Sequence, residues 1–415
     1  MDNSILDVII IGAGHSGLSL SFYLKNRGLS HVILEQKSIG NSWSSQRWDS
    51  FKLNTPNNTN ALPGKGNDFT DPESFCSATE FVSYLKDYAK EFDLPVKEKA
   101  KVRSVTKGGD LFLTTIFHDG VEKSYFSKNV VVASGSQNQK VMPALATKIA
   151  GDIIQFHAGD YRNSEQLPDG GVLVVGSGQS GVQIADDLIG AGRKLYLATS
   201  MVARVPRRYR GKDIMEWMNL VGFNDHRPED VADPQMLKMK QPQISGVGSR
   251  GKTLSLQGLA KEGAVILGKV HHADGYNLEI HKNAAQHVHF GDEFSKKVKG
   301  IVDEFIKNAG LDVPQAEIED ADLPDDNASC VFPETSINLK KHNITSIIWS
   351  TGFSGNFDYL QFPIMKSDGT LKHKDGVSEI NGLYFLGFPW LRKRKSGIVF
   401  GIEEDAKYIS DQLKF

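Results

Sequence analysis

The feature that most constrains the fold is a glycine-rich turn that occurs twice, at the same place in two similar segments. The first segment runs DVIIIGAGHSGLSLSFYL from Asp7, and a shift of 164 residues superposes it on GVLVVGSGQSGVQIADDL from Gly171. In both copies an apolar run leads into GxGxxG and then an amphipathic run, which predicts a strand, a tight turn and a helix. An internal repeat of this kind predicts two domains built on the same unit.

Each residue of the turn has a physical role in binding a dinucleotide. Gly12 allows the tight turn, Gly14 lets the backbone approach a pyrophosphate, and Gly17 lets the helix pack on the strand. His15 and Ser16 lie at the start of the helix, where free N–H groups and the helix dipole favour phosphate. The corresponding residues of the second copy are Gly176, Gly178, Gln179, Ser180 and Gly181. We therefore expect both copies to bind a dinucleotide.

The residue that ends the next strand distinguishes the two sites. In the first copy it is Glu35, 18 residues after Gly17, where a carboxylate can accept hydrogen bonds from ribose hydroxyls. In the second copy the acid is missing, and the side chains at and after this position are Thr199, Ser200, Arg204, Arg207 and Arg208. An acid repels a 2′-phosphate, whereas hydroxyls and arginines bind it, so the second site is expected to prefer NADPH. The alternative is that most of these arginines belong to a solvated basic loop.

Size and charge restrict the class of protein. The 415 residues are 40% hydrophobic, which suits a soluble globular protein of two or three domains. A formal net charge of −2 gives no electrostatic reason to expect nucleic acid or an anionic membrane as the main partner. The two cysteines, Cys76 and Cys330, form no CxxC pair, which favours a reducing compartment and disfavours a zinc site or a redox disulfide. Without a signal peptide or an apolar run of membrane-spanning length, we expect a cytoplasmic protein.

The other segments are read from their periodicity. A polar stretch from Ile39 to Gly64 carries large aromatics but no regular pattern, and the least regular region is 211–330, which includes a glycine and basic tract at 246–252. The histidines near the end of this region include His287 and His289, which would share one face of a strand. No HExxH or cysteine pattern accompanies them, so we expect no metal. The remaining predicted elements are a surface helix at 74–92, strands at 102–105, 111–117 and 125–135, a helix at 293–310, and a final helix that starts near Gly397.

Together these motifs resemble the two-dinucleotide flavoproteins and, within them, the flavin-containing monooxygenases. The resemblance rests on the two GxGxxG turns, which we call the first and second fingerprints. It also rests on the ASG and STG turns that end at Gly135 and Gly352, and on the GLYFLG strand. GNSW, which ends at Trp43, is similar to the family's GGxW segment, and SFKLN matches the spacing of its serine and its active-site asparagine, here Asn54. The lack of a CxxC pair separates the chain from the disulfide reductases.

The resemblance implies an α/β fold of two Rossmann-like dinucleotide-binding domains, the second inserted into the first. FAD would bind to a domain formed by residues 1–165 and 345–415, and NADPH to residues 166–344, with the irregular segment at 211–330 inside the second domain. The family also has a signature before its second fingerprint, and this chain matches it in part, at His157 and Tyr161. These two residues would either contact NADPH or pack the linker between the domains.

The resemblance also implies a reaction. NADPH would reduce FAD, O2 would form a C4a-hydroperoxyflavin, and one oxygen would pass to a nitrogen or sulfur nucleophile of a small molecule. The alternatives are a reductase or oxidase that releases H2O2, a Baeyer-Villiger oxygenation, and a redox-sensing flavoprotein with little turnover. The Trp-Pro-Asp continuation typical of Baeyer-Villiger enzymes is absent, because Arg162 and Asn163 follow Tyr161.

Single residues receive roles in the same way. Asn54 would be the catalytic amide beside the flavin and NADP, although an asparagine before Thr55 and Pro56 also suits an ordinary turn. The further residues expected at FAD are Ser42, Trp43, Arg47 and Thr55; for Trp43 and Arg47 the alternative is packing within the loop. The helix after Ser396 would direct its N-terminal dipole at the flavin. Neither the substrate nor the oligomeric state follows from the sequence, and a homo-oligomer stays open.

Overall fold

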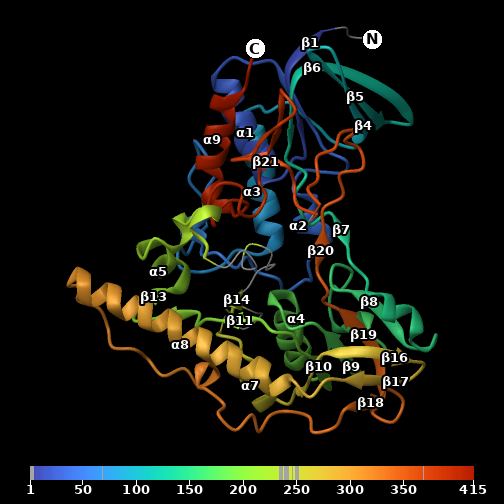
Figure 1. The fold of residues 1–415 in the computed structure, drawn as a ribbon, viewed down its shortest axis with the longest axis vertical. Coiled ribbons are helices and arrows are strands. Elements are labelled where there is room, and N and C mark those ends of the chain that lie inside the picture. Colours follow the sequence, from blue (N-terminus) through green and yellow to red (C-terminus); the bar gives the residue numbers. More distant parts are fainter. Residues whose placement is uncertain are drawn as a thin grey trace.

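A computed structural model shows two lobes, one built around a mixed sheet with parallel central strands and the other around a parallel sheet, with both chain termini at the far end of the first (Figure 1). The structure describes residues 4–67, 69–232, 252–367 and 369–415, together with positions 237, 243, 244, 246 and 247. Of the predicted basic tract at 246–252, residues 248–251 therefore lie outside the described residues.

The first lobe consists of residues up to 138 and from 355 onward, and its sheet surrounds β1. This strand pairs in parallel with β2 and with β6, and Val8, Ile9 and Ile10 are completely buried between covering layers. Burial on both faces explains why the strand is an unbroken apolar run from Val8 to Ile11, after Asp7 near its start. Within the described residues the sheet order is β21-β22-β23-β6-β1-β2-β3, with β4 and β5 continuing from β6 as antiparallel strands. The strands are β1 Ile5–Ile11, β2 His31–Leu34, β3 Val96–Lys97, β4 Lys101–Gly108, β5 Leu111–His118, β6 Val121–Val132, β21 His373–Lys374, β22 Val377–Ser378 and β23 Leu383–Phe385.

Three helices cover the first sheet. Helix α1, His15–Asn26, packs against α3, Ala78–Glu91, and α9, Ile402–Gln412. A capping box starts α3, with Ser77 Oγ accepting from Glu80 N (3.2 Å) and Glu80 Oε2 accepting from Ser77 N (2.7 Å). The predicted helix at 74–92 is thus present but begins at this cap.

Two features of the first lobe differ from the prediction. The polar stretch after β2 contains a short helix, α2 Asn41–Ser45, and a 3₁₀ turn, η1 Asn57–Thr59. The last helix begins at Ile402, after a 3₁₀ turn η7 at Val399–Gly401, rather than near Gly397. Local periodicity places helix boundaries poorly, because tight turns continue the same spacing.

The second lobe contains a five-stranded parallel sheet in the order β15-β10-β9-β19-β8 among its described residues. Helix α4, Gln179–Gly190, follows β9 and packs on β9 and β10. The strands of this sheet are β8 Ile154–His157, β9 Gly171–Val175, β10 Leu195–Ala198, β15 Val265–Leu267 and β19 Ile344–Trp349; beside it lies an antiparallel sheet of β16 Val270–Asp274, β17 Asn277–Ile280 and β18 Ser336–Asn338.

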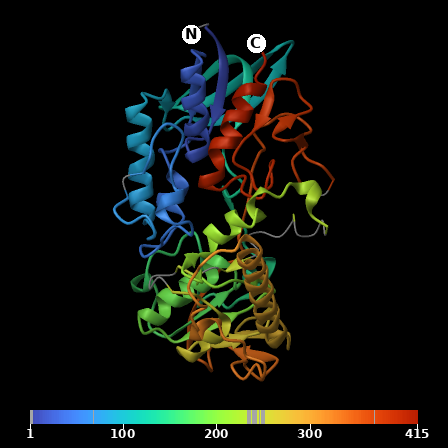
Figure 2. The same ribbon diagram turned by 90° about the vertical axis from the view of Figure 1, so that its left-hand side faces the viewer.

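The segment predicted as irregular contains the longest described helix, α8 Ala284–Ala309, which runs along the second lobe (Figure 2). It begins nine residues before the helix predicted at 293–310. His287 and His289 therefore lie on a helix, and the expectation that they share a strand face is wrong. Shorter elements complete this lobe: η2 Ala144–Lys148, η3 Ser164–Gln166, β11 Ala203–Arg204, β12 Arg208–Tyr209, β13 Lys212–Asp213, α5 Ile214–Leu220, η4 Phe223–Asp225, η5 Pro228–Asp230, β14 Gln243–Ile244, α7 Leu256–Lys261 and η6 Asp320–Asp322.

The chain passes between the lobes on two adjacent strands, β7 Gln139–Lys140 and β20 Phe353–Ser354, which pair antiparallel. The second lobe is thus an insertion in the first, which confirms the predicted fold class. The predicted boundaries at 165/166 and 344/345 do not coincide with this crossing, because β8 and β19 both belong to the second sheet. A buried apolar run does not reveal from its sequence which of two sheets it joins.

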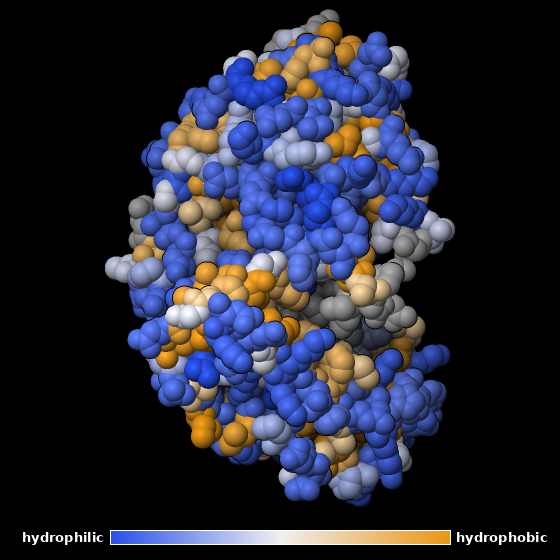
Figure 3. Space-filling model, turned by 60° about the vertical axis from the view of Figure 1, so that its left-hand side comes forward, coloured by the Kyte–Doolittle hydropathy of each residue, from blue (hydrophilic) through white to orange (hydrophobic). Residues whose placement is uncertain are grey.

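The surface is mainly hydrophilic on the face shown in Figure 3. Hydrophobic residues gather on this face where the two lobes meet. No helix in the described part of the chain combines the length and the apolar character needed to cross a bilayer.

Candidate functional site

The glycines of the first fingerprint have different surroundings. Gly12 has a φ of +109°, and a Cβ there would lie 2.6 Å from Ala133 O. A Cβ on Gly17 would overlap the carbonyl oxygen of Gly12. At Gly14, by contrast, a Cβ would meet no described atom within 4 Å. Gly12 and Gly17 are thus required by the turn itself, and Gly14 leaves the approach from outside open.

The second fingerprint has the same arrangement. Gly176 has a φ of +107° and its Cβ would lie 2.5 Å from Ser350 O, while a Cβ on Gly181 would overlap Gly176 O. Around Gly178 the described atoms again leave the Cβ position open. Gln179 and Ser180 follow as the first residues of α4, directly after this turn. Both turns therefore fit the phosphates of a dinucleotide.

Glu35 and His15 show how the first turn is held. The Glu35 carboxylate accepts from Ala13 N (3.0 Å) and from Lys37 N (2.9 Å), and burial raises its pKa. Desolvation lowers the pKa of His15 to about 4 although the ring has a hydrogen bond with the Gly397 backbone, and its buried Nε2 has no partner among the described residues. Ser16 packs against the turn at Gly387. A buried ring nitrogen without a partner, on the residue after Gly14, fits a polar ligand at this turn.

The residues expected from the GNSW segment are held by packing. Trp43 lies edge-to-face on Phe81 with ring centroids 5.2 Å apart, and the Arg47 guanidinium lies 5.1 Å from the Trp43 ring. Burial lowers the pKa of Arg47 to about 10. Ser42 is exposed, and Thr55 donates from its buried hydroxyl to Asn60 Oδ1 (2.5 Å). The packing alternative for Trp43 and Arg47 thus has direct structural support, and a contact with FAD stays a prediction.

Asn54 joins the first lobe to the second fingerprint. Its Oδ1 accepts from Gln183 Nε2 (2.8 Å) and from Gln179 Nε2 (3.3 Å), both on α4. Its backbone oxygen accepts from Arg207 Nη1 (3.1 Å). A residue of the loop after β2 therefore lies at the start of the helix that follows the second glycine turn. This contact between lobes could not be read from local sequence, because 125 residues separate Asn54 from Gln179.

A second contact joins the loop after β2 to helix α4. Asp187 of α4 accepts from Ser50 Oγ (2.5 Å) and from the hydroxyl of Tyr161 (2.7 Å), which is completely buried. His157 Nδ1 accepts from Gly159 N (3.0 Å), so its Nε2–H donates to Gly352 O (2.9 Å). The polar atoms of His157 and Tyr161 are therefore engaged within the second lobe, and Asp187 extends this contact to Ser50 of the first lobe.

The three predicted arginines are separated in space. Arg207 forms a buried ion pair with Asp213, and Arg208 forms an exposed pair with Glu73 (2.9 Å). Of these three arginines, Arg204 lines a small cavity beside the second fingerprint. The residues around this cavity are Ser177, Ser200, Val202, Arg204, Leu256, Gln257, His287, Val288 and Gly291.

This cavity adjoins the position where the first copy has its acid. Thr199 is buried, and its hydroxyl is 2.8 Å from His287 Nδ1. Ser177 Oγ accepts from Ser200 N (2.9 Å) and donates to Ser200 O (3.2 Å), which ties the glycine turn to the end of β10. Gln257 and His287 were not assigned to this site from the sequence, since α7 and α8 reach the cavity only through the tertiary fold; Ser177 lies within the second glycine turn itself and was also not assigned.

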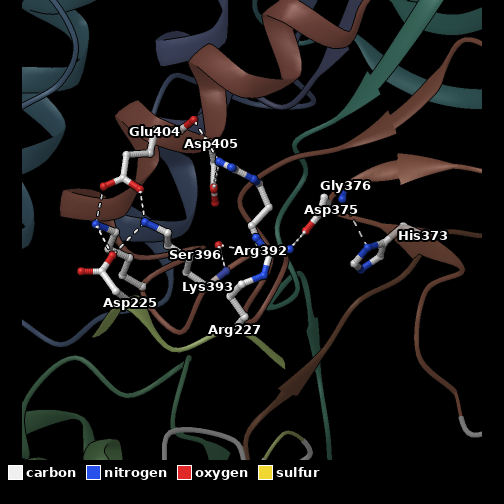
Figure 4. Close-up of polar contacts among 11 residues, drawn as sticks. Asp225, Arg227, His373, Asp375, Gly376, Arg392, Lys393, Ser396, Glu404 and Asp405 are labelled. Atoms are coloured by element: carbon white, nitrogen blue, oxygen red, sulfur yellow. Dashed lines mark hydrogen bonds and ion pairs between the residues drawn. The ribbon is translucent and has the colours of Figure 1, made fainter. Parts of the chain in front are cut away.

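The basic loop RKRK links the lobes by charge (Figure 4). Lys393 Nζ lies 2.9 Å from both Asp225 Oδ1 of the second lobe and Glu404 Oε2 of α9. Lys395 pairs with the same two carboxylates, and Arg227 pairs with Asp375 (3.0 Å). The first turn of α9 contains three acids, Glu403 to Asp405, so its dipole already interacts with negative side chains. Direct action of this dipole on a flavin stays a prediction.

The two cysteines are poorly suited to thiol redox chemistry. Cys76 is buried in the first lobe, and Cys330 lies in the second, each as a free thiol. Burial raises the pKa of both to about 12. A thiol must be deprotonated to attack a disulfide, so neither is activated in this structure.

Comparison with known proteins agrees with this architecture. The family model described as pyridine nucleotide-disulphide oxidoreductase matches residues 9–217. The oxidoreductase CzcO of Bacillus subtilis is 30% identical over 410 residues, which cover 98% of this chain and 99% of CzcO. The probable indole-3-pyruvate monooxygenase YUCCA9 of Arabidopsis thaliana is 31% identical over 230 residues, covering 51% of this chain and 53% of its own. A solved structure of a flavin-containing monooxygenase from Stenotrophomonas maltophilia has a TM-score of 0.67 at 19% identity, covering 99% and 98% of the two chains.

Proposed function

Because the chain belongs to the pyridine nucleotide-disulphide oxidoreductase family, we propose that this oxidoreductase is an FAD- and NADPH-dependent monooxygenase. FAD is assigned to the turn at Gly12–Gly17 and NADPH to the turn at Gly176–Gly181. The bound flavin supplies the redox chemistry and, as a C4a-hydroperoxyflavin, the oxygen that is transferred. The acceptor is a nitrogen or sulfur nucleophile of a small molecule.

The observation that carries the proposal is the position of Asn54. Its side-chain oxygen accepts from Gln179 and Gln183, at the start of the helix that follows the second fingerprint, although Asn54 belongs to the first lobe. These contacts between the lobes support a role for the Asn54 amide between the two bound dinucleotides. Such a group can orient the nicotinamide relative to the flavin and donate a hydrogen bond to an oxygen atom between them.

The cysteines support oxygen rather than a disulfide as the electron acceptor. The chain contains two cysteines, in different lobes and in no CxxC pair. The relatives and the solved structure described above include a probable monooxygenase and a flavin-containing monooxygenase, which agrees with this choice. The second candidate is a reductase or oxidase that releases H2O2, which the same two cofactor sites would permit.

Rapid-mixing spectroscopy tests the proposal. The purified flavoprotein is reduced with one equivalent of NADPH without oxygen and is then mixed with oxygenated buffer while the flavin spectrum is recorded. A monooxygenase should show a C4a-adduct before oxidised flavin returns. Direct return to oxidised flavin with release of H2O2 would favour the second candidate, and a lack of reduction by NADPH would contradict both.

The variant Asn54→Ser tests the assigned residue in the same experiment. FAD content should stay unchanged, because Asn54 holds α4 rather than the first glycine turn. The lifetime of the adduct should shorten about tenfold or more, as expected when one positioned donor is lost. The control is Asn58→Ser, an exposed asparagine of the same loop. Equal decay in the wild type and Asn54→Ser would remove the role of Asn54.

A further inference from the structure

His287 of α8 contacts the position that normally holds the ribose-binding acid. Thr199 Oγ1 donates its one hydrogen to Leu267 O (2.7 Å), so toward His287 Nδ1 (2.8 Å) it can only accept. The ring therefore carries a hydrogen on Nδ1. In the neutral ring, Nε2 is left as an acceptor, which cannot bind a phosphate oxygen.

The neighbouring cation is already balanced by carboxylates. Arg204 binds both Asp292 (2.5 Å) and Asp322, and Lys299 also pairs with Asp322. Two cations thus face two anions within this buried group. Arg204 was expected to bind the 2′-phosphate, but most of its charge is neutralised before a nucleotide arrives.

The charged groups around His287 do not change this balance in favour of a phosphate. Helix α7 contributes the uncharged Gln257 to the cavity, and Lys269 lies on the loop between β15 and β16. Burial lowers the pKa of His287, and the charge of Lys269 adds to this effect. The charged side chains on the packed elements are Arg204 on β11, Lys269, Asp292 and Lys299 on α8, Glu319 before η6 and Asp322 within η6. A neutral His287 therefore leaves the cavity without a surplus of positive charge.

We infer that His287 distinguishes NADPH from NADH by taking up a proton at Nε2 and donating from it to the 2′-phosphate. The dianionic phosphate brings the charge that stabilises the imidazolium, and one proton moves from solvent to the ring on binding and returns on release. Nδ1 keeps its hydrogen bond to Thr199 throughout. The inference rests on the proposed use of NADPH, and it assigns the preference for the phosphate to α8 rather than to the arginine-rich stretch.

Calorimetry with oxidised holoenzyme tests this directly. NADP⁺ and NAD⁺ are titrated at pH 7.5 in two buffers that differ in their enthalpy of ionisation, which gives the number of protons bound. NADP⁺ should take up close to one proton and NAD⁺ close to none. Between the pKa of His287 in the free enzyme and its pKa in the complex, the affinity for NADP⁺ should fall about tenfold per pH unit, as a single linked proton requires, and it should level off at higher pH.

Two variants identify the group that receives the proton. His287→Asn keeps a donor toward Thr199 but cannot titrate, and it should weaken NADP⁺ binding about tenfold or more while NAD⁺ binding changes less than about twofold. Its proton uptake should disappear. His289→Asn, an exposed position on the same helix, is the matched control and should behave as the wild type.

The outcomes separate this inference from the proposed function. Uptake that persists in His287→Asn would place the proton on the phosphate itself and overturn the role of His287, as would an equal loss of affinity for both nucleotides. A wild type that binds NADP⁺ without proton uptake overturns it whether or not the variant folds. Binding of neither nucleotide by the wild type would instead contradict the proposed NADPH site.

Discussion

Gly14 and Gly17 stand three residues apart in one turn, yet the structure gives them different surroundings. The Cβ position of Gly17 overlaps Gly12 O, a backbone atom that cannot move away. Gly14 has a φ of −82°, which any residue can adopt, and open space beside it. Gly17 is therefore required by the fold, and we propose that the open space beside Gly14 accommodates the pyrophosphate.

Alanine substitutions should separate these two roles. Gly17→Ala should destabilise the apoprotein by about 1–3 kcal/mol, the usual cost of overpacking. Gly14→Ala should leave the unfolding free energy of the apoprotein nearly unchanged and reduce its FAD content, because the methyl group occupies the approach to the pyrophosphate. Urea unfolding of the apoprotein and flavin absorbance of the purified protein measure the two effects. Full FAD content in Gly14→Ala would contradict the assignment.

Helix α8 is attached to the second lobe by the charged group around Arg204. Asp322 accepts from Arg204 and from Ser295 Oγ (2.8 Å) and pairs with Lys299, and Arg204 also binds Asp292 within α8. The side chains of Arg204 and Asp322 are 4% and 3% exposed, so solvent cannot replace either partner. The same helix carries His287, so this anchor also sets the position of the cavity.

Removal of one buried carboxylate should therefore lower the free energy of unfolding strongly. Asp322→Ala leaves Arg204 and Lys299 short of a partner and should lower the free energy of unfolding by about 3–5 kcal/mol. Arg208→Ala removes an exposed pair with Glu73 and should cost less than about 1 kcal/mol. Urea unfolding compares the two variants with the wild type. Similar losses in both would contradict the view that burial decides the effect.

The two lobes are connected by more than the β7–β20 ribbon. The backbone N–H of Arg394 donates to His226 O (2.8 Å), and that of Lys395 donates to Asn224 O (3.1 Å). Around these bonds, the lysines of the basic loop lie between Asp225 and Glu404 (Figure 4). The loop that follows the last strand of the first sheet is thus fixed by the inserted lobe.

Neutralising the two carboxylates should loosen this contact without unfolding either lobe. In Asp225→Asn/Glu404→Gln, amide hydrogen exchange should become faster at 223–226 and 390–396, while exchange in β1 and β9 stays as in the wild type. The change in unfolding free energy should be about 1 kcal/mol or less per pair, since Asp225 and Glu404 are largely solvated. Lys407→Ala, which removes an exposed pair with Asp411 on α9, is the control. Unchanged exchange at both segments would show that the backbone bonds alone hold the contact.

The sequence by itself determined the two glycine turns and the strand and helix on either side of each, whereas the insertion of one lobe into the other was implied by the family resemblance. The turns and their flanking elements depend on local steric demands and on periodicity, which neighbouring residues carry completely. The missing acid at Thr199 followed from the spacing of the repeat, and the role of Asn54, implied by the family resemblance, stays a prediction.

Only the tertiary structure decided which side chains surround these positions. In the folded chain, Gln183 donates a hydrogen bond to Asn54, and Arg204 forms ion pairs with two aspartates. His287 contacts Thr199, which lies 88 residues earlier in the sequence. The tertiary structure also assigned β8 and β19 to the second sheet. The physical reason is that a local pattern records whether a side chain is buried, whereas its partners depend on how distant elements pack.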